Sequence, residues 1–339
     1  MFLISPELTQ YKANLHCHST GSDGRLTPIE LRDAYRSRGY AVLAITDHEA
    51  PKDHSALSTD DFLLLTGYEV YIRPDPHCRY DVYAPEIHLN LFAKSPHNET
   101  LICYNPAYCK YLTAEQQSAL TKAGSEQTRE YTVEYINTFI RTARENGYLV
   151  SYNHPTWSME DESRILAYEG CFSMEMLNYN SRMRHDLEYN GALYNTLLRH
   201  GKAMFLHAGD DNHNVYPFDH PHNDSFGCAT MILAEELTYE AIVNAMEQGN
   251  MYPTEGPLFE SVVFDGENVH IHCTPVSLIC CQVGSKSPAY YRADGDSLTN
   301  VSLPLPAGAR YLRITLTDSH GRHADTRAFT RDELGLPPL

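Results

Sequence analysis

The spacing of apolar residues along the chain changes near residue 257. Before that point, short apolar runs such as YAVLAITDH and DFLLLTGYEV alternate with segments such as LTPIELRDAYRSRG, whose apolar residues recur at helical spacing. Repeated strand-and-helix units predict parallel strands joined by right-handed crossovers. Seven or eight such units between residue 11 and about residue 256 favour an α/β barrel over an open sheet.

After Gly256-Pro257 apolar residues alternate with polar ones, as in LFESVVFDGENVHIHC and ARYLRITLTDSHGR, and no helical pattern intervenes. We therefore expect a barrel domain over residues 1–257 and a small antiparallel, β-sandwich-like domain over residues 258–339. Residues 94–125 are polar and rich in tyrosine, and they interrupt the barrel pattern. We interpret them as an insertion over one end of the barrel, either a lid or an ordinary excursion of the chain.

The composition narrows the classes of partner. The 339-residue chain has 26 basic and 44 acidic residues, a formal charge of −18, without long runs of one sign. This argues against a protein that coats long duplex nucleic acid or binds an anionic membrane. The start MFLISPELTQYK lacks the features of a signal peptide, and no apolar run approaches membrane-spanning length. The nine cysteines, an odd number often within apolar runs, fit reduced thiols in a cytoplasmic protein.

The stretch HCHSTGSDG, residues 16–24, contains the first candidate site. In a strand, residues i and i+2 point the same way, so His16 and His18 present two imidazoles to one side while Cys17 points away. Two imidazoles that face one point can hold a metal ion, although two exposed strand histidines would show the same spacing. Asp23 follows in a Gly-Ser-Asp-Gly loop, where an aspartate can also be an ordinary turn residue.

Further candidate ligands fall in or at the ends of other predicted strands. They are His48, Glu69, His88, His154, Asp211 and His213. In a parallel barrel the carboxyl ends of all strands meet at one mouth, where the active site of this architecture lies. We therefore expect these imidazoles and carboxylates to gather there. His77 and His97 are possible substitutes for His88, but only His88 lies in a strand-like context, IHLNLF.

The order of these motifs, HxH and SDG, then TDH, GxE, a strand histidine, NHP and DxH, resembles that of the PHP superfamily, named after polymerase and histidinol phosphatase domains. The resemblance covers residues 11 to about 256. It implies a distorted (β/α)7 TIM-like barrel, the PHP fold, that holds two or three divalent ions, with Glu69, Asp211 and His213 as catalytic residues. Carried over, the ligands are His16, His18, Glu69 and Asp211 for one ion, Glu69, His88 and His154 for a second, and Asp23, His48 and His213 for a third.

The charge of this set can be considered apart from the resemblance. Six neutral imidazoles and three carboxylates carry −3, so three divalent ions would leave the cluster near +3 and attract an anionic ester despite the global charge. Imidazole-rich ligation suits Zn, Fe or Mn better than Mg or Ca. A metal-bound hydroxide at a di- or trinuclear centre would attack the ester without a serine or cysteine nucleophile.

Three functions remain open. The leading hypothesis is a hydrolase, a metal-dependent phosphoesterase that acts on a small anionic substrate, a phosphorylated metabolite or nucleotide. The segment EELTYEAIVNAMEQGNMYPTEGP and the later RITLTDSHGRHA resemble, more weakly, a metallohydrolase subgroup that includes carbamate-ester hydrolases. This allows hydrolysis of a non-phosphate ester, amide or carbamate. The third hypothesis is a non-catalytic metal-binding module. Long duplexes are disfavoured as substrates, whereas 24 tyrosines could stack the bases of short oligonucleotides.

Four more residues are candidates for supporting roles. Asp47 could orient a ligand histidine through its far ring nitrogen, or cap a helix. Glu175 ends the predicted strand FSMEMLN and could face the mouth. Arg182 and Arg184 follow it, and either could bind a phosphate through its guanidinium fork or belong to a solvated loop. The sequence does not indicate the oligomeric state.

Overall fold

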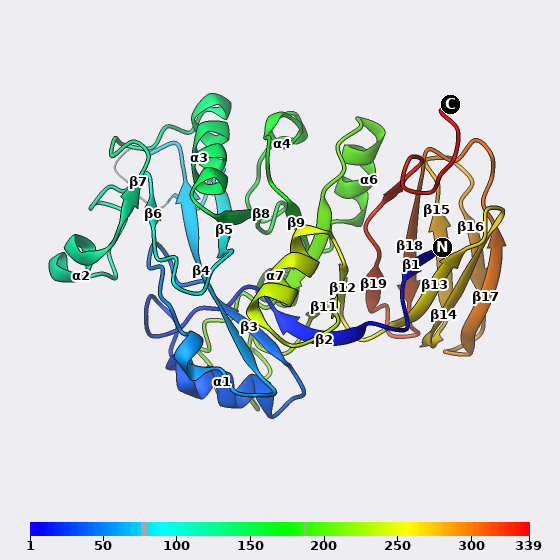
Figure 1. Cartoon of the computed structure of the whole chain (residues 1–339), viewed down its shortest axis with the longest axis horizontal. Helices are drawn as coiled ribbons and strands as arrows, with labels where there is room; N and C mark the ends of the chain where they lie inside the picture. Colours follow the sequence, from blue (N-terminus) through cyan, green and yellow to red (C-terminus); the bar gives the residue numbers. More distant parts are fainter. Residues whose placement is uncertain (76–80, 186–187) are drawn as a thin grey trace.

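The computed structural model describes residues 1–75, 81–185 and 188–339. Within these ranges the chain is a mixed α/β protein with a 14-stranded mixed sheet, a four-stranded sheet and few helices (Figure 1). In the order of their pairing, the strands of the large sheet are β10 (Phe205–Gly209), β9 (Ser173–Asn178), β8 (Tyr148–Tyr152), β5 (Ile87–Ala93), β4 (Leu63–Ile72), β3 (Val42–Ile45), β2 (Thr9–Asn14), β11 (Ala229–Ala234), β12 (Met251–Thr254), β19 (His323–Asp325), β18 (Tyr311–Thr317), β15 (Leu278–Gln282) and β16 (Ala289–Arg292), while β20 (Phe329–Thr330) pairs with β18.

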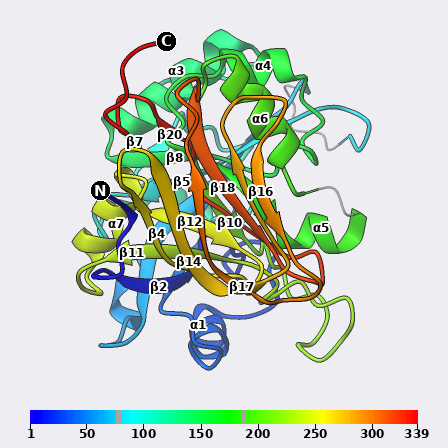
Figure 2. The same ribbon diagram turned by 90° about the vertical axis from the view of Figure 1, so that its right-hand side faces the viewer.

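The helices are short and amphipathic. They are α1 (Pro28–Arg36), α3 (Val133–Glu145), α4 (Glu162–Ala167), α5 (Tyr179–His185), α6 (Gly191–Arg199) and α7 (Tyr239–Glu247). At the start of α1, Thr27 and Glu30 bond reciprocally to each other's backbone N–H groups, which is a capping box. The buried face of α3 packs against β8 and consists of Ile136, Phe139, Ile140 and Ala143. Both views place α3, α4 and α6 along one side of the molecule (Figure 1, Figure 2).

The prediction of parallel strands is wrong at β5, and also at β11, which pairs antiparallel with β2. Strands β2, β3 and β4 pair in parallel, as do β8, β9 and β10, but β5 runs antiparallel to both β4 and β8. An antiparallel strand brings its first residues, not its last, to the edge where its neighbours end. His88, the second residue of β5, therefore reaches the same edge as the residues that follow the parallel strands.

A closed TIM-like barrel is not confirmed. In the described ranges the regular ladder of the large sheet ends at β10, and β10 forms no ladder with β2. The residues that follow these two strands do approach each other: the His18 N–H donates to the carbonyl oxygen of Asn212 (3.1 Å), and the Asp211 N–H donates to that of His16 (2.8 Å). Two candidate ligand segments are thus joined by backbone hydrogen bonds.

The C-terminal β region combines both sheets. The four-stranded sheet has the order β1 (Phe2–Ile4), β13 (Phe259–Phe264), β14 (Asn268–Val276) and β17 (Leu298–Pro304), and its strands pair antiparallel. The first strand of the chain therefore lies beside β13, as Figure 1 shows in blue against gold. The apolar core of this region includes Val262, Ile271, Ile279 and Ile314.

The tyrosine-rich segment over residues 94–125 has its own small elements. Strand β6 (Leu101–Ile102) pairs in parallel with β7 (Lys122–Ala123), and α2 (Ala114–Ala119) lies between them in sequence. Gln117 Nε2 donates to the carbonyl oxygens of Cys109 (3.0 Å) and Leu112 (2.9 Å), which holds α2 against the preceding loop. In the part of the chain that the structure describes, no helix has both the length and the apolar character needed to span a bilayer.

Candidate metal centre

Two buried histidines follow β2. His16 Nε2 and His18 Nε2 lie 3.3 Å apart, and both side chains have no exposed surface. Asp211 Oδ1 is 3.2 Å from His16 Nε2 and 3.0 Å from His18 Nε2. Asp211 has a φ of 52°, a left-handed backbone conformation that aspartate adopts more readily than most residues. This local conformation brings the aspartate of the GDDNH segment next to the histidines of HCHST.

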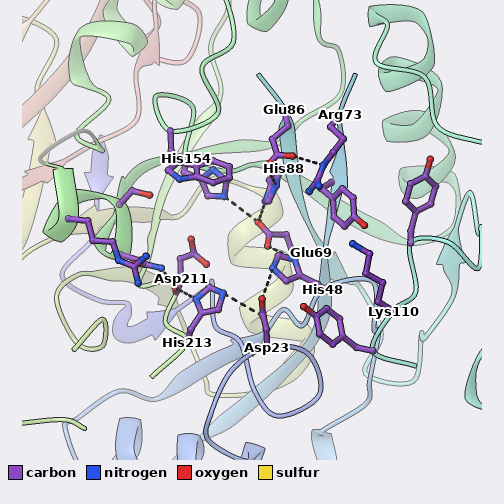
Figure 3. Close-up of a pocket in the computed structure, with 17 residues that line it drawn as sticks. Asp23, His48, Glu69, Arg73, Glu86, His88, Lys110, His154, Asp211 and His213 are labelled. Atoms are coloured by element: carbon purple, nitrogen blue, oxygen red, sulfur yellow. Dashed lines mark hydrogen bonds and ion pairs between the residues drawn. The ribbon is translucent and has the colours of Figure 1, made fainter. Parts of the chain in front are cut away.

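Glu69 of β4 lies at the centre of the site. Its Oε1 is 3.3 Å from His16 Nε2, 3.0 Å from His88 Nδ1 and 3.3 Å from His154 Nε2. Its Oε2 is 3.0 Å from His48 Nδ1. Burial acts to raise the pKa of Glu69, but the imidazoles around it hold that pKa well below its usual range. Glu69 is therefore an ionised carboxylate with donor atoms from four strands or strand ends around it (Figure 3).

A third group of donor atoms lies next to the first two. Asp23 Oδ1 is 3.5 Å from His213 Nε2, and Asp23 Oδ2 is 3.7 Å from His48 Nε2. The His18 ring lies 4.4 Å, centroid to centroid, from the rings of both His48 and His213. Burial and the neighbouring rings of His213 and His48 lower the pKa of His18 to about 4, so this imidazole is neutral at neutral pH.

Asp47 holds the loop that carries Asp23. Its Oδ1 accepts hydrogen bonds from the Ser19 N–H and the Ser22 hydroxyl (2.7 Å each), and its Oδ2 accepts one from the Ser19 hydroxyl (2.5 Å). A Cβ at Gly21 would lie 2.3 Å from Asp47 Oδ2, so the loop passes too close for a side chain. The predicted roles of Asp47, orienting a histidine or capping a helix, are not what these contacts show, because its acceptor atoms are directed to the loop.

Glu175 lies behind the two histidines of HCH, but it does not end its strand as predicted: it is the third of the six residues of β9, which ends at Asn178. Its Oε1 is 2.7 Å from His16 Nδ1, while its Oε2 accepts from the His154 N–H (2.8 Å) and from Asn178 Nδ2 (3.0 Å). A carboxylate at Nδ1 fixes the orientation of an imidazole and leaves Nε2 directed to the cluster.

The two arginines differ in position. Arg184 lines the cavity above the cluster, whereas Arg182 Nε is 2.6 Å from Glu255 Oε1 and does not line the cavity. The carboxylate of Asp210, next to Asp211, accepts hydrogen bonds from the Tyr35 hydroxyl and the N–H groups of residues 226–228, so it holds the backbone. His97 is exposed and pairs with Asp53 (2.7 Å), and His77 lies outside the described residues.

Glu86 was not predicted from the sequence. It is buried, with Oε1 3.3 Å from His88 Nε2 and Oε2 2.6 Å from Arg73 Nε. Arg73 in turn packs over the ring of Tyr71, 4.1 Å from its centroid. The sequence does hold a signal for Glu86, because residues two apart at the start of a strand point to the same side, as His16 and His18 do.

Glu188 is a second buried carboxylate that sequence reasoning missed. It accepts hydrogen bonds from the N–H groups of Thr156 (2.8 Å) and Trp157 (3.0 Å) and from Asn190 Nδ2 (3.1 Å). Burial raises its pKa to about 7. It fixes the turn that follows His154 and places the Trp157 ring edge-on to the His154 ring, 4.7 Å away.

A cavity of about 440 Å³ opens above the cluster. It is lined by Asp23, His48, Glu69, Tyr71, Arg73, Glu86, His88, Tyr108, Lys110, Tyr111, His154, Trp157, Asn180, Ser181, Arg184, Asp211 and His213 (Figure 3). Seven of these residues belong to the predicted ligand set, so the structure brings these ligand candidates to one solvent-accessible space. His16 and His18 lie beneath it.

The donor atoms fit divalent cations. Three overlapping groups have ligand atoms within 4.8 Å of one another: His18, Asp23, His48 and His213; His16, His18 and Glu69; and Glu69, His88 and His154. Two imidazole nitrogens that face each other can share at most one proton, and His48 Nδ1 and His88 Nε2 are buried without a well-formed hydrogen bond. Imidazole and carboxylate donor atoms thus converge without a complete set of hydrogen bonds, as expected of a metal site. The assignment of each residue to an ion stays a prediction.

These features define a class of protein: a mixed α/β chain whose strand ends gather histidine and carboxylate clusters able to hold metal. No protein-family profile matches the sequence. The DNA polymerase/3'-5' exonuclease PolX of Bacillus subtilis is 36% identical over an alignment of 93 residues, which covers 22% of this chain and 16% of that protein. A 5'-3' exoribonuclease of Haemophilus influenzae is 41% identical over 63 residues, 17% of this chain and 23% of that protein. The chain thus matches less than a quarter of either relative.

Three solved structures are similar over most of their length. A two-domain protein of Bacteroides vulgatus that contains a predicted PHP-like metal-dependent phosphoesterase has 15% identity and a TM-score of 0.46, covering 97% of this chain and 89% of that one. A putative metal-dependent phosphoesterase of Bifidobacterium adolescentis has 16% identity, a TM-score of 0.38, and coverages of 71% and 97%. An amidohydrolase of Chromobacterium violaceum, solved with sulfate and no metal, has 17% identity, a TM-score of 0.41, and coverages of 70% and 96%.

Proposed function

We propose that this protein is a metal-dependent hydrolase of the PHP type that cleaves a small phosphate ester at a di- or trinuclear centre. The observation that carries the proposal is the position of Glu69, whose two oxygens lie next to donor atoms of His16, His48, His88 and His154 beneath an open cavity. We also propose Zn, Fe or Mn as the metal, since six of the nine proposed ligands are imidazoles.

The roles of the residues follow from their contacts. Divalent ions held by the nine proposed ligands would supply a Lewis acid for the ester oxygens and an activated water. His213 Nδ1 is 3.0 Å from the carbonyl oxygen of Asp211, so the ring proton lies on Nδ1 and Nε2 presents a lone pair toward Asp23. Glu175 and Asp47 keep His16 and the Asp23 loop in place. Together these contacts preorganise the donors around one point before substrate arrives.

The cavity has chemistry for an anionic substrate. Its cationic side chains are Arg73, Lys110 and Arg184. The Arg73 guanidinium is shared with Glu86, whereas Lys110 and Arg184 form no ion pair among the residues that the structure describes. Cationic groups around a metal-binding cluster favour a phosphate over an uncharged ester. This supports the phosphoesterase over the ester, amide or carbamate hydrolase.

We also propose how the barrel closes and where the chain divides into two parts. We treat the strands from β2 to β10 as a distorted (β/α)7 barrel whose closure depends on the hydrogen bonds between residues 16–18 and 211–212. We keep the division into residues 1–257 and 258–339, with the qualification that β1 belongs with the second part by its pairing with β13.

The test is release of phosphate or p-nitrophenol from a panel of phosphomonoesters and phosphodiesters by protein loaded with Mn, Fe or Zn. The variant is Asp211→Asn, and the matched control is Asp265→Asn, an exposed aspartate of the β13–β14 turn. Metal-dependent release that only Asp211→Asn abolishes is the expected result. Bound metal without turnover of any phosphate ester would shift the proposal to the carboxyl-ester, amide or carbamate class, and failure to bind metal would overturn it.

A further inference from the structure

The tyrosine-rich segment over residues 94–125 contributes three nearby side chains to the lining of the cavity, Tyr108, Lys110 and Tyr111. Tyr108 anchors the segment: its ring packs edge-on against Tyr71 with centroids 5.9 Å apart, and its hydroxyl accepts from the Arg129 N–H (2.8 Å). The Tyr111 ring stacks on the ring of His48, at 6.4 Å and 21°. The segment is therefore packed directly onto the candidate metal centre.

The anchor extends to the backbone next to a proposed ligand. Arg129 is buried and binds the carboxylate of Glu49, the residue after His48, through both terminal nitrogens. The Arg129 Nη1 also donates to the carbonyl oxygen of Tyr71 (2.9 Å). Lys110 is two residues from Tyr108, whose hydroxyl is bonded to the backbone of the ion-paired Arg129. The backbone of Lys110 is therefore fixed relative to Glu69 and His48.

Lys110 is one of two cationic side chains of the cavity, with Arg184, that have no ion pair among the described residues. Figure 3 shows its side chain extending from the segment toward Glu69 and His48, on the side of the cavity opposite Asp211 and His213. Its Nζ is 5.5 Å from the centroid of Tyr71, and none of the described carboxylates pairs with it. Four carboxylates line the same cavity, namely Asp23, Glu69, Glu86 and Asp211. A single ammonium group turned toward this space and left without an anion has the chemistry of a substrate contact.

We propose that Lys110 is a specificity-determining residue that binds the non-bridging oxygens of the substrate's phosphate group, and that the 94–125 segment serves to place it there. The inference rests on the proposed function, because it assumes a phosphorylated substrate. The Lys110 ammonium adds a charge-assisted hydrogen bond to the phosphate oxygens, and Lys110 is not one of the proposed metal ligands.

The test compares Lys110→Met and Lys110→Arg with the wild-type protein, all loaded with metal. The control is Lys286→Met, an exposed lysine of the C-terminal β region. Binding of inorganic phosphate is measured by titration calorimetry, metal content by elemental analysis, and KM and kcat on the best ester of the panel. We expect Lys110→Met to weaken phosphate binding and raise KM by about tenfold each, the size of one charge-assisted contact, with kcat changed by less than about threefold.

Other outcomes discriminate between the proposals. Lys110→Arg should keep phosphate affinity within about threefold of wild type, since the charge is retained. Unchanged phosphate binding in Lys110→Met, or no phosphate binding by the wild-type protein, overturns the role of Lys110. A fall in kcat with unchanged phosphate affinity also overturns it and points to the leaving group. If phosphate binding depends on Lys110 but no ester is hydrolysed, the proposed function fails while the phosphate contact stands.

Discussion

Buried charged groups occur in two regions of this molecule, and they are arranged differently. In the C-terminal β region, Arg313 Nη2 is 2.6 Å from Asp325 Oδ1, and both side chains have no exposed surface. The pair carries one charge of each sign, and Arg313 Nη1 also donates to Asn195 Oδ1 of α6 (2.8 Å). At the candidate metal centre, the carboxylates of Glu69 and Asp211 instead face the imidazole nitrogens of several histidines, which also face one another.

The difference lies in how the buried charge of each region is balanced. Moving ions out of water costs free energy that only a nearby opposite charge and hydrogen bonds offset. Arg313 and Asp325 supply that compensation to each other and join β18, β19 and α6. The cluster around Glu69 has three carboxylates and six imidazoles, so its compensation must come from protons or from bound cations. We infer that the first region contributes to stability and the second is organised for binding.

The largest effect should come from Glu69→Gln, which keeps the shape of the side chain and removes its charge. Glu69 is a proposed ligand of two of the three ions, so we expect loss of bound metal and a fall in kcat/KM on the order of 10³-fold, equivalent to several kcal/mol of transition-state stabilisation. Metal content by elemental analysis and esterase assays measure this, with Asp265→Asn as control. Full metal occupancy in Glu69→Gln would contradict the central role of Glu69.

The next effect concerns stability rather than metal. Arg313→Ala leaves Asp325 as an uncompensated buried charge, and breaking a buried pair in this way costs about 3–5 kcal/mol of unfolding free energy. Urea unfolding of the metal-free protein measures it. The double variant Arg313→Met with Asp325→Leu removes both charges and should lie closer to wild type. A cost below about 1 kcal/mol for Arg313→Ala would mean that water reaches Asp325. That result would contradict the conclusion that the two charges are buried and compensate each other.

Glu188 gives a pH test of a buried carboxylate beside the candidate metal centre. Its pKa is raised by burial from 4.5 to about 7, so the unfolded chain ionises at a lower pH than the folded one. The folded state then binds more protons between these values, and stability falls as pH rises across that interval, by about 3 kcal/mol in total. Glu188→Gln removes this titration.

The measurement is the unfolding free energy of the wild type and of Glu188→Gln at pH 5 and pH 8, both with chelator. The difference between the proteins should shift in favour of the variant as pH rises. Lost hydrogen bonds to the Thr156 and Trp157 N–H groups add an offset that does not depend on pH. An unchanged difference between pH 5 and pH 8 would show that Glu188 titrates normally and is not desolvated.

The smallest effect, on metal affinity, tests whether Glu86 supports a ligand histidine or is itself a ligand. Glu86→Gln removes the charge beside His88 Nε2 but none of the proposed ligands, so we expect metal affinity to fall by about 10- to 100-fold, as is usual for groups that orient ligand histidines. Glu175→Gln should give a similar loss through His16. Competition titration with a chelating dye measures both. Complete loss of one ion in Glu86→Gln would instead make Glu86 a ligand.

Some of the site follows from local rules and some does not. The two-residue spacing of His16 and His18 was enough to predict that both side chains face one point, and the same rule applied to Glu86 and His88 would have found Glu86. Asp47 could not be assigned in this way, because its partners, Ser19 and Ser22, lie in a loop whose path depends on glycines at positions 21 and 24. The match of the remaining ligand candidates to individual ions stays a prediction.

What the sequence by itself determined was the chemistry and its rough position: the types of ligand, their order along the chain, and the change from α/β to β pattern near residue 257. These follow from periodicity, which is a local property. Only the tertiary structure decided that β5 runs antiparallel, that β1 pairs with β13, and that Lys110 and Glu86 join the cavity. Such pairings depend on contacts between segments far apart in the chain, whose free energy of packing no single segment encodes.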